Sequence, residues 1–306
     1  MLTLVGDGAT AVLDPACGAD ILSFVDHTTG IDVLFETPWR ERADAVHAGQ
    51  RPLAFDTKSR WLEQYRGGWQ TLCPHAGEAA TVHGAVAGYH GEASLVPWTV
   101  GEAGTDHATL TVDLFSVPVT IWRHIRLTGR TLTVEDHLTN QSPADLHLTY
   151  VQHPALSAQL LTGDCRIDTG ARTFVPNLAE DFAEQGFTWP WVTTADGQTW
   201  DLRRVPGPSE QRAVFGWLED FESHWFSVAN SDVGLGVRGE WDGDHLPNAW
   251  FWQELNASAE FPWFERARTL ALEPSTSPTR SDVPGGLALE GGETTTITMS
   301  LAIESL

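Results

Sequence analysis

Hydrophobic and polar residues alternate with a period of two along most of the chain. The alternation is clearest over residues 110–114, 132–138 and 297–303, where every second side chain is apolar apart from Asp136. This period predicts β-strands with one buried face. A helical period occurs only in short pieces, notably residues 178–187, so parallel strands linked by helices are not expected. The pattern predicts an all-β protein built from antiparallel sheets.

No segment divides the chain into separate parts. Its 306 residues would allow two domains at roughly 150 residues each, but all-β folds of this length often form one domain. Neither a repeat of fixed period nor a low-complexity linker is visible. We therefore expect one large β-sandwich domain that spans residues 1–306.

Composition and charge restrict the class of protein and its partners. Hydrophobic residues make up 42% and charged residues 19% of the chain, which excludes intrinsic disorder, and no long apolar run predicts a membrane span. The formal net charge is −23, whereas nucleic-acid binding needs clustered lysine and arginine. Three scattered cysteines predict buried thiols. Because the amino-terminal segment lacks the basic region of a signal peptide, we expect a cytoplasmic protein without nucleic-acid or membrane partners.

The sequence contains none of the short motifs that mark metal, nucleophile or phosphate chemistry. Its 12 histidines include no H-E-x-x-H or H-x-H spacing, and no cysteine and histidine residues have zinc spacing. No serine lies in a G-x-S-x-G elbow, and the paired glycines are not followed by lysine and a hydroxyl residue. We therefore expect no metal and no cofactor.

Two strand-like segments carry a titratable residue directly before a proline. One alternating strand runs into His153 and Pro154, and a second runs into Glu273 and Pro274. A residue before proline is held in extended backbone, and we expect each proline to end its strand, so both side chains are predicted to be rigidly aimed. Ordinary rim residues at strand ends would show the same pattern.

Two further segments complete an ordered set. The stretch GGWQTLCPHAG begins at Gly67, and HGEASLVPW begins at His90; the strand that reaches His153 and the stretch LEPST around Glu273 follow. In this order the segments resemble the aldose 1-epimerase, or galactose mutarotase-like, family from Gly67 to Ser275. The resemblance implies a large antiparallel β-supersandwich with a sugar cleft across one sheet. It also implies that Glu273 is the general base, His153 the general acid and His90 a second histidine that contacts the sugar.

Five more residues are expected to contact the sugar. Trp69 and Trp252 are predicted to form an aromatic wall, because each stands beside a glutamine in a turn-flanked segment. Gln70 and His75 belong to the same motif segment as Trp69, and Arg66 directly precedes it. The expected partners are a small-molecule sugar and, for assembly, a second copy in a homodimer.

The sequence departs from the galactose-active branch of the family at both histidines. That branch has two glycines after the first histidine and an aromatic residue, asparagine and leucine after the second. Here His90 is followed by Gly91-Glu92 and His153 by Pro-Ala-Leu, so the sugar stays open. The carboxylate that grips sugar hydroxyls in that branch has no matching position, and only Asp220 and Asp244 are suggested for it.

Three alternatives remain open from the sequence. A sugar-binding protein on the same fold would need no proton transfer. A glycoside hydrolase would need a second carboxylate, for which Glu254 is the candidate beside Glu273. An epimerase for a phosphorylated or sulfonated sugar would need a cation, for which the candidates are Arg42, Arg60 and Arg66.

Overall fold

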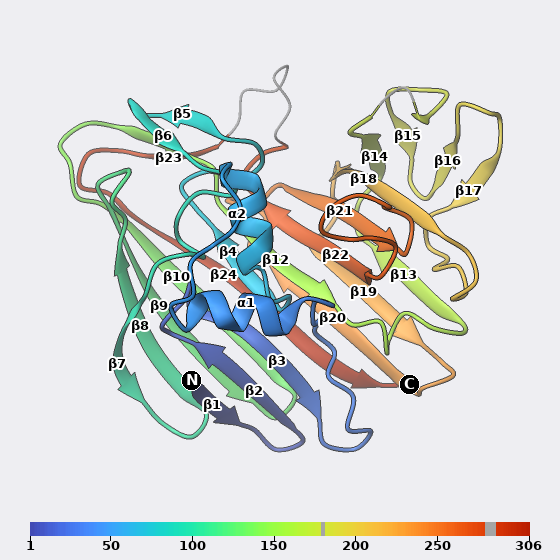
Figure 1. Cartoon of the computed structure of the whole chain (residues 1–306), viewed down its shortest axis with the longest axis horizontal. Coiled ribbons are helices and arrows are strands. Elements are labelled where there is room, and N and C mark those ends of the chain that lie inside the picture. Colours follow the sequence, from blue (N-terminus) through green and yellow to red (C-terminus); the bar gives the residue numbers. More distant parts are fainter. Residues whose placement is uncertain (179–180, 279–285) are drawn as a thin grey trace.

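Two large antiparallel sheets dominate the computed structural model, which describes residues 1–178, 181–278 and 286–306 (Figure 1). The larger sheet has ten strands, which in their order across the sheet are β1 (Leu2–Val5), β2 (Ala9–Asp14), β3 (Asp20–Asp26), β4 (Trp69–Leu72), β12 (Val151–Leu156), β22 (Arg268–Ser275), β21 (Asn248–Leu255), β18 (Arg212–Glu219), β14 (Thr173–Pro176) and β15 (Phe187–Thr188).

The second sheet has eight strands. In order they are β13 (Cys165–Thr169), β19 (Trp225–Asn230), β20 (Leu235–Trp241), β24 (Thr294–Ser305), β10 (Thr131–Asn140), β9 (Val119–Thr128), β8 (His107–Asp113) and β7 (Thr99–Ala103). Three pairs of short strands lie outside these sheets: β5 (Ala80–Val82) with β6 (Ala85–Ala87), β11 (Leu146–Leu148) with β23 (Leu287–Leu289), and β16 (Trp191–Thr193) with β17 (Thr199–Asp201).

The strands predicted from the period of two are confirmed at β8, β10 and β24. The short helix predicted over residues 178–187 is wrong. The described part of residues 178–187 contains no α-helix, and its last residue, Phe187, begins strand β15. The helices are instead α1 (Arg40–His47) and α2 (Thr57–Gln64). Neither is amphipathic over enough turns to stand out in the sequence, because each has only eight residues.

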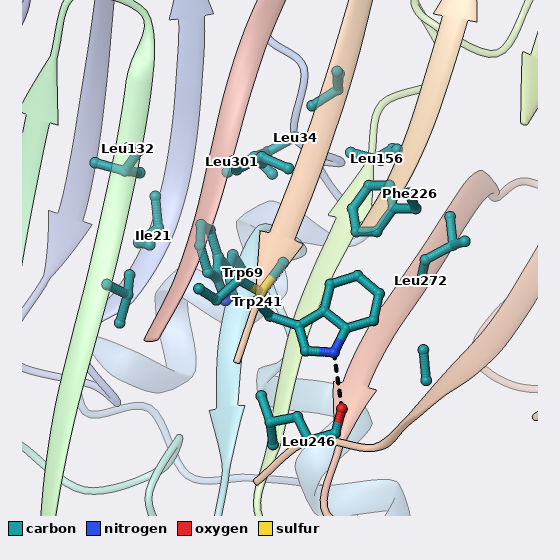
Figure 2. Packing of buried hydrophobic residues seen from close by; sticks show 14 of the residues in the cluster. Ile21, Leu34, Trp69, Leu132, Leu156, Phe226, Trp241, Leu246, Leu272 and Leu301 are labelled. Atoms are coloured by element: carbon teal, nitrogen blue, oxygen red, sulfur yellow. Dashed lines mark hydrogen bonds between the residues drawn. The ribbon is translucent and has the colours of Figure 1, made fainter. Parts of the chain in front are cut away.

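The main hydrophobic core lies between the two sheets. Leucines and aromatic residues from both sheets pack there, among them Leu272 of β22 and Leu301 of β24 (Figure 2). Trp241 is buried in the same core, and its indole N–H donates a hydrogen bond of 2.9 Å to the carbonyl oxygen of Leu246 (Figure 2). A smaller hydrophobic cluster includes Trp61 and Leu62 of α2 with residues of β4, β12 and β21. Helix α2 therefore packs against the ten-stranded sheet.

A buried polar network links the two sheets directly behind β12. Arg123 of β9 forms a bidentate ion pair with Asp136 of β10, at 2.7 and 2.6 Å, and both side chains are almost fully buried. The hydroxyl of Tyr150 donates to the same Asp136 carboxylate. Gln152 donates to the Tyr150 oxygen and accepts a hydrogen bond from the indole N–H of Trp69. The network thus fixes the backbone next to His153 to the second sheet.

Among the helices of the described ranges, none is long and apolar enough to cross a membrane.

Candidate functional site

His153 and Glu273 face each other across two neighbouring strands. Strand β12 pairs with β22 through Val151 and Ser275 at one end and through Ala155 and Ala271 at the other. Continuing this register places His153 directly opposite Glu273. Paired positions of antiparallel strands project their side chains to the same face of the sheet. Two residues separated by 120 positions in the sequence are therefore neighbours.

The two prolines lie inside their strands, so the prediction that they end them is wrong. β12 continues through Pro154, and β22 continues through Pro274. Proline has no backbone N–H and adopts extended backbone readily, so it fits a strand wherever a ladder hydrogen bond is missing. Both prolines fall in the stretch between the paired ends of β12 and β22, where no residue pairs join the strands. The gap in the ladder coincides with the two titratable side chains.

His153 and Glu273 are close together and buried, and only some of their polar atoms have hydrogen-bond partners among the described residues. His153 Nε2 lies 3.5 Å from Glu273 Oε1, and the side chains are only 7% and 2% exposed. Among the described residues, His153 Nδ1 and Glu273 Oε2 are buried without any hydrogen-bond partner. Buried polar atoms are normally paired, so these free atoms indicate a place where a polar ligand binds. Burial raises the pKa of Glu273 well above its ordinary value and lowers the pKa of His153 to about 4.

His90 is the third member of the group. Its ring centroid lies 6.4 Å from that of His153, and its backbone has a φ of 61°, a left-handed conformation that is costly for a residue with a side chain. The backbone N–H of Gly77 donates to His90 Nδ1 at 3.0 Å. Burial lowers the pKa of His90 well below its ordinary value. A neutral ring that accepts at Nδ1 carries its proton on Nε2, so His90 is a hydrogen-bond donor.

Gly91, directly after His90, packs closely against another part of the chain. Its φ is 71°, and a Cβ at this position would lie 2.5 Å from the carbonyl oxygen of Cys73. Gly91 therefore holds the His90 segment against the end of β4 and fixes the position of the imidazole.

These groups lie in a cleft of about 720 Å³ on the ten-stranded sheet. Strand β21 contributes Trp250 and Trp252, and helix α2 and the residue after it contribute Trp61 and Tyr65. Tyr65 meets the His153 ring edge-on at 5.9 Å between centroids, and Trp252 lies 5.8 Å from it. Aromatic walls with few polar groups are typical of small-molecule sites. Trp252 lines the cleft, and its contact with a sugar stays a prediction.

Trp61, Tyr65, Tyr89, Trp250 and Trp263 also line the cleft, and sequence reasoning missed all of them. Trp61 belongs to a helix that was not predicted and Tyr65 follows that helix, whereas Tyr89 and Trp263 lie in turns and Trp250 lies in the continuous apolar run of β21. Only the unusual count of 14 tryptophans signalled an aromatic site.

Three of the predicted sugar contacts do not reach this cleft. Trp69 is 2% exposed, packs in the core between the sheets and donates to Gln152, so its nomination for the aromatic wall is wrong. Gln70 is buried and donates to Asp20 and to the carbonyl oxygen of Gly67. Arg66 is buried in an ion pair of 2.6 Å with Asp14. These side chains support the folded backbone and do not line the cleft.

The mouth of the cleft carries His75 and the only lysine of the chain, Lys58. His75 is partly exposed and contacts the carbonyl oxygen of Glu78. The Lys58 ammonium forms an ion pair of 2.5 Å with the Glu78 carboxylate. No arginine is among the described lining residues. The cleft therefore offers no unpaired cation at its described surface.

The remaining candidates also lie elsewhere. Arg42 forms an ion pair with Glu63, and Arg60 donates to the carbonyl oxygen of Ala54. Asp220 accepts from the Thr173 hydroxyl, and Asp244 is in a turn that follows β20. None of these four residues lines the cleft around Glu273.

Glu254 is a structural residue. It is 2% exposed and accepts hydrogen bonds from the backbone N–H groups of Ala257 and Ser258 and from the Ser258 hydroxyl. It pairs with Thr269, four residues along β22 from Glu273, which corresponds to about 13 Å at the usual rise of a strand. That separation is too large for the paired carboxylates of a glycoside hydrolase.

Within the described ranges, no group of three or more histidine, cysteine, aspartate or glutamate side chains is placed to hold a metal ion.

Comparison with known proteins gives one family and a set of similar folds. The model of a family described as a domain of unknown function (DUF4432) matches residues 35–300. No curated protein matches the chain. Solved structures with a similar fold include a galactose mutarotase related enzyme from Lactobacillus acidophilus, at 14% identity and a TM-score of 0.66, covering 99% of this chain and 97% of that one.

Two further structures show the same likeness. A galactose mutarotase-like protein from Lactobacillus casei is 15% identical with a TM-score of 0.65, covering 99% of this chain and 100% of its own. An aldose epimerase homologue from Caenorhabditis elegans is 14% identical with a TM-score of 0.64, covering 100% and 98%. The β-supersandwich implied by the sequence resemblance is therefore confirmed. The chain has the galactose mutarotase-like fold and belongs to the DUF4432 family.

Proposed function

We propose that this protein is an aldose 1-epimerase, which interconverts the α- and β-anomers of a sugar by opening and closing its ring. One observation carries the proposal: His153 Nε2 and Glu273 Oε1 lie 3.5 Å apart in an aromatic cleft, and each side chain has a second polar atom to which the described part of the chain offers no hydrogen-bond partner. His90 supports it as a neutral hydrogen-bond donor beside the pair.

The reaction moves two protons at one carbon atom. One group takes the proton of the O1 hydroxyl while C1=O1 forms, and the electrons of the bond between C1 and the ring oxygen pass to that oxygen. A second group protonates the ring oxygen. The open-chain aldehyde rotates, and the reverse steps close the ring on its other face. Since both oxygens are bonded to C1, the donor and acceptor must be neighbours, as His153 and Glu273 are.

The pair has the proton count that this exchange needs. Ordinary pKa values assign Glu273 as the base and His153 as the acid at neutral pH. Burial shifts both pKa values the other way, toward a protonated Glu273 carboxyl and a neutral His153 imidazole. In either arrangement the pair shares one proton, so one member donates and the other accepts. Ring closure returns the proton, and no cofactor enters the balance.

The alternatives are supported less well. A phosphorylated or sulfonated substrate would need a free cation, but Lys58 is paired with Glu78 and the arginine candidates lie outside the cleft. The carboxylate considered for a glycoside hydrolase, Glu254, is too far along the sheet from Glu273. A binding protein without turnover would have no need of a cross-strand donor and acceptor, and the experiment below distinguishes it.

The decisive experiment is mutarotation by Glu273→Gln. Glutamine preserves the shape of the side chain but cannot exchange a proton, so we expect a loss of about 100-fold or more in turnover, with sugar affinity nearly unchanged. The same is expected of His153→Asn. The double variant should lose less than the product of the two single losses, because the groups act as a unit.

Polarimetry on a panel of neutral aldoses measures the rate, and calorimetry measures the affinity. Glu304→Gln, an exposed carboxylate at the end of β24, is the matched control and should behave as wild type. A Glu273→Gln variant with wild-type turnover would refute the mechanism. A wild-type protein that binds sugars but does not accelerate mutarotation would show a binding protein instead.

A further inference from the structure

A second cavity continues the cleft on the far side of Trp252. Its volume is about 570 Å³, and it shares Asn177, Phe215, Trp252, Ser258 and Trp263 with the cleft that holds Glu273. The two spaces are therefore adjoining compartments of one surface depression, with Trp252 in their common wall. The first compartment alone is already within the usual size of a small-molecule site, so the second is additional room.

An uncovered strand edge forms part of the second cavity. Strand β14 pairs with β18 only from Gly216 to Glu219, and on this side no described strand covers the preceding segment of β18. Ala213, Val214 and Phe215 of that segment line the cavity. The carbonyl oxygen of Phe215 already accepts a hydrogen bond from the backbone N–H of Asn177, so the part of this edge before Phe215 is the part that the described residues leave open to the hydroxyl groups of a ligand.

The side chains of the cavity point to a neutral, hydroxyl-bearing ligand. Its polar lining residues are Asn177, Gln198 and Ser258 together with the carboxylates of Asp181, Asp196 and Glu254. Trp200, Trp252 and Trp263 supply aromatic surface. Neither lysine nor arginine occurs among the described lining residues. Aromatic faces combined with amide, hydroxyl and carboxylate groups suit the apolar C–H faces and the hydroxyls of a sugar ring, and the carboxylates disfavour an anionic ligand.

We propose that the second cavity is a subsite for a second sugar ring, so that the preferred substrate is a neutral reducing disaccharide. This inference rests on the proposed function. The reducing ring lies at His153 and Glu273 with its C1 hydroxyl free, since ring opening requires it. The second ring is attached through another hydroxyl and extends past Trp252 into the cavity beside Ala213.

The test is to fill the second cavity and leave the first unchanged. Ala213 is exposed, lines only the second cavity and carries no functional group, so Ala213→Trp should occupy the subsite. The probes are glucose and galactose as monosaccharides, and maltose, cellobiose and lactose as disaccharides. Ala288→Trp, an exposed alanine of the short strand β23, is the matched control, and circular dichroism confirms folding.

We expect at least one disaccharide to bind the wild-type protein about tenfold or more tightly than the monosaccharide that forms its reducing ring, because the second ring adds contacts in the second cavity. Ala213→Trp should abolish that gain and leave monosaccharide binding and turnover unchanged, whereas Ala288→Trp should preserve it. Equal affinity for mono- and disaccharides, or a gain that survives Ala213→Trp, would overturn the subsite. Binding is measured by calorimetry independently of turnover, so a disaccharide preference without mutarotation would retain the subsite and refute the epimerase.

Discussion

His153 and Glu273 are buried together in a part of the cleft where the described residues offer neither of them a neutralising partner other than each other. Burial disfavours the charged form of each side chain, which is why their pKa values move in opposite directions. A neutral pair that shares one proton is the result. At the scale of single residues, burial of the pair thus sets the proton count of the site.

The pH dependence of mutarotation follows from these directions. The rate should fall on the acid side with an apparent pKa of about 4, because protonation of His153 then leaves the pair without an acceptor. It should fall again on the alkaline side, above the ordinary pKa of glutamate, when Glu273 loses the proton and the pair has no donor. Rates corrected for spontaneous mutarotation, with folding checked at each pH, test this. An acid limb centred near pH 6.5, the ordinary value for histidine, would contradict it.

At the scale of the strands, the position of the site depends on buried contacts between the two sheets. Alternation along β22 puts Leu272 into the core and Glu273 into the cleft. Along β12, Gln152 joins the buried network of Arg123 and Asp136, and the next residue is His153. The same short strands therefore hold the core together and aim the reacting groups.

Asp136→Asn should destabilise the protein by about 3–5 kcal/mol, because the loss of one partner leaves a buried Arg123 charge uncompensated. Chemical denaturation measures the change. The neighbouring Glu135→Gln is the control: its side chain is 41% exposed, and the expected change is within about 0.5 kcal/mol. If the two variants had the same free energy of unfolding, the ion pair between Arg123 and Asp136 would not stabilise the protein as predicted.

The whole molecule is strongly acidic, with 18 basic and 41 acidic residues. Such a charge surrounds the protein with a negative potential that repels anions at low salt. The cleft has only one lysine at its mouth, and Glu78 neutralises it. The negative potential of the whole molecule and the neutralised lysine of the cleft thus both favour an uncharged ligand over an anionic one.

Glucose 6-phosphate should accordingly be a poorer substrate than glucose. We expect its KM to be roughly tenfold higher at low ionic strength, with the difference narrowing as salt screens the repulsion, while the KM for glucose stays constant. Polarimetry at low and high salt makes the comparison. A phosphorylated sugar that proves the better substrate at low salt would contradict this interpretation.

The sequence predicted the fold class, and it singled out His153, Glu273 and His90, which the structure brings together in one cleft; of the aromatic walls it predicted only Trp252. The period of two indicated the β-sandwich, and the ordered motifs indicated the three polar residues; their roles in catalysis stay a prediction. Two Trp-Gln pairs show why the rest failed. Trp69 points into the core and its neighbour Gln70 away from it, whereas Trp252 points into the cleft and its neighbour Gln253 away from it. The dipeptides are identical, and only the register of each strand decides which side chain faces the cleft.

The single lysine of this chain has a practical consequence. Amine-directed reagents find only one side-chain target, Lys58, in addition to the amino terminus. That target is half exposed and stands at the entrance of the cleft. A fluorophore or surface linker attached there would report directly on what enters the cleft, and the same attachment would also obstruct it. Random amine coupling, which is harmless for most proteins, is therefore a site-directed modification of this one.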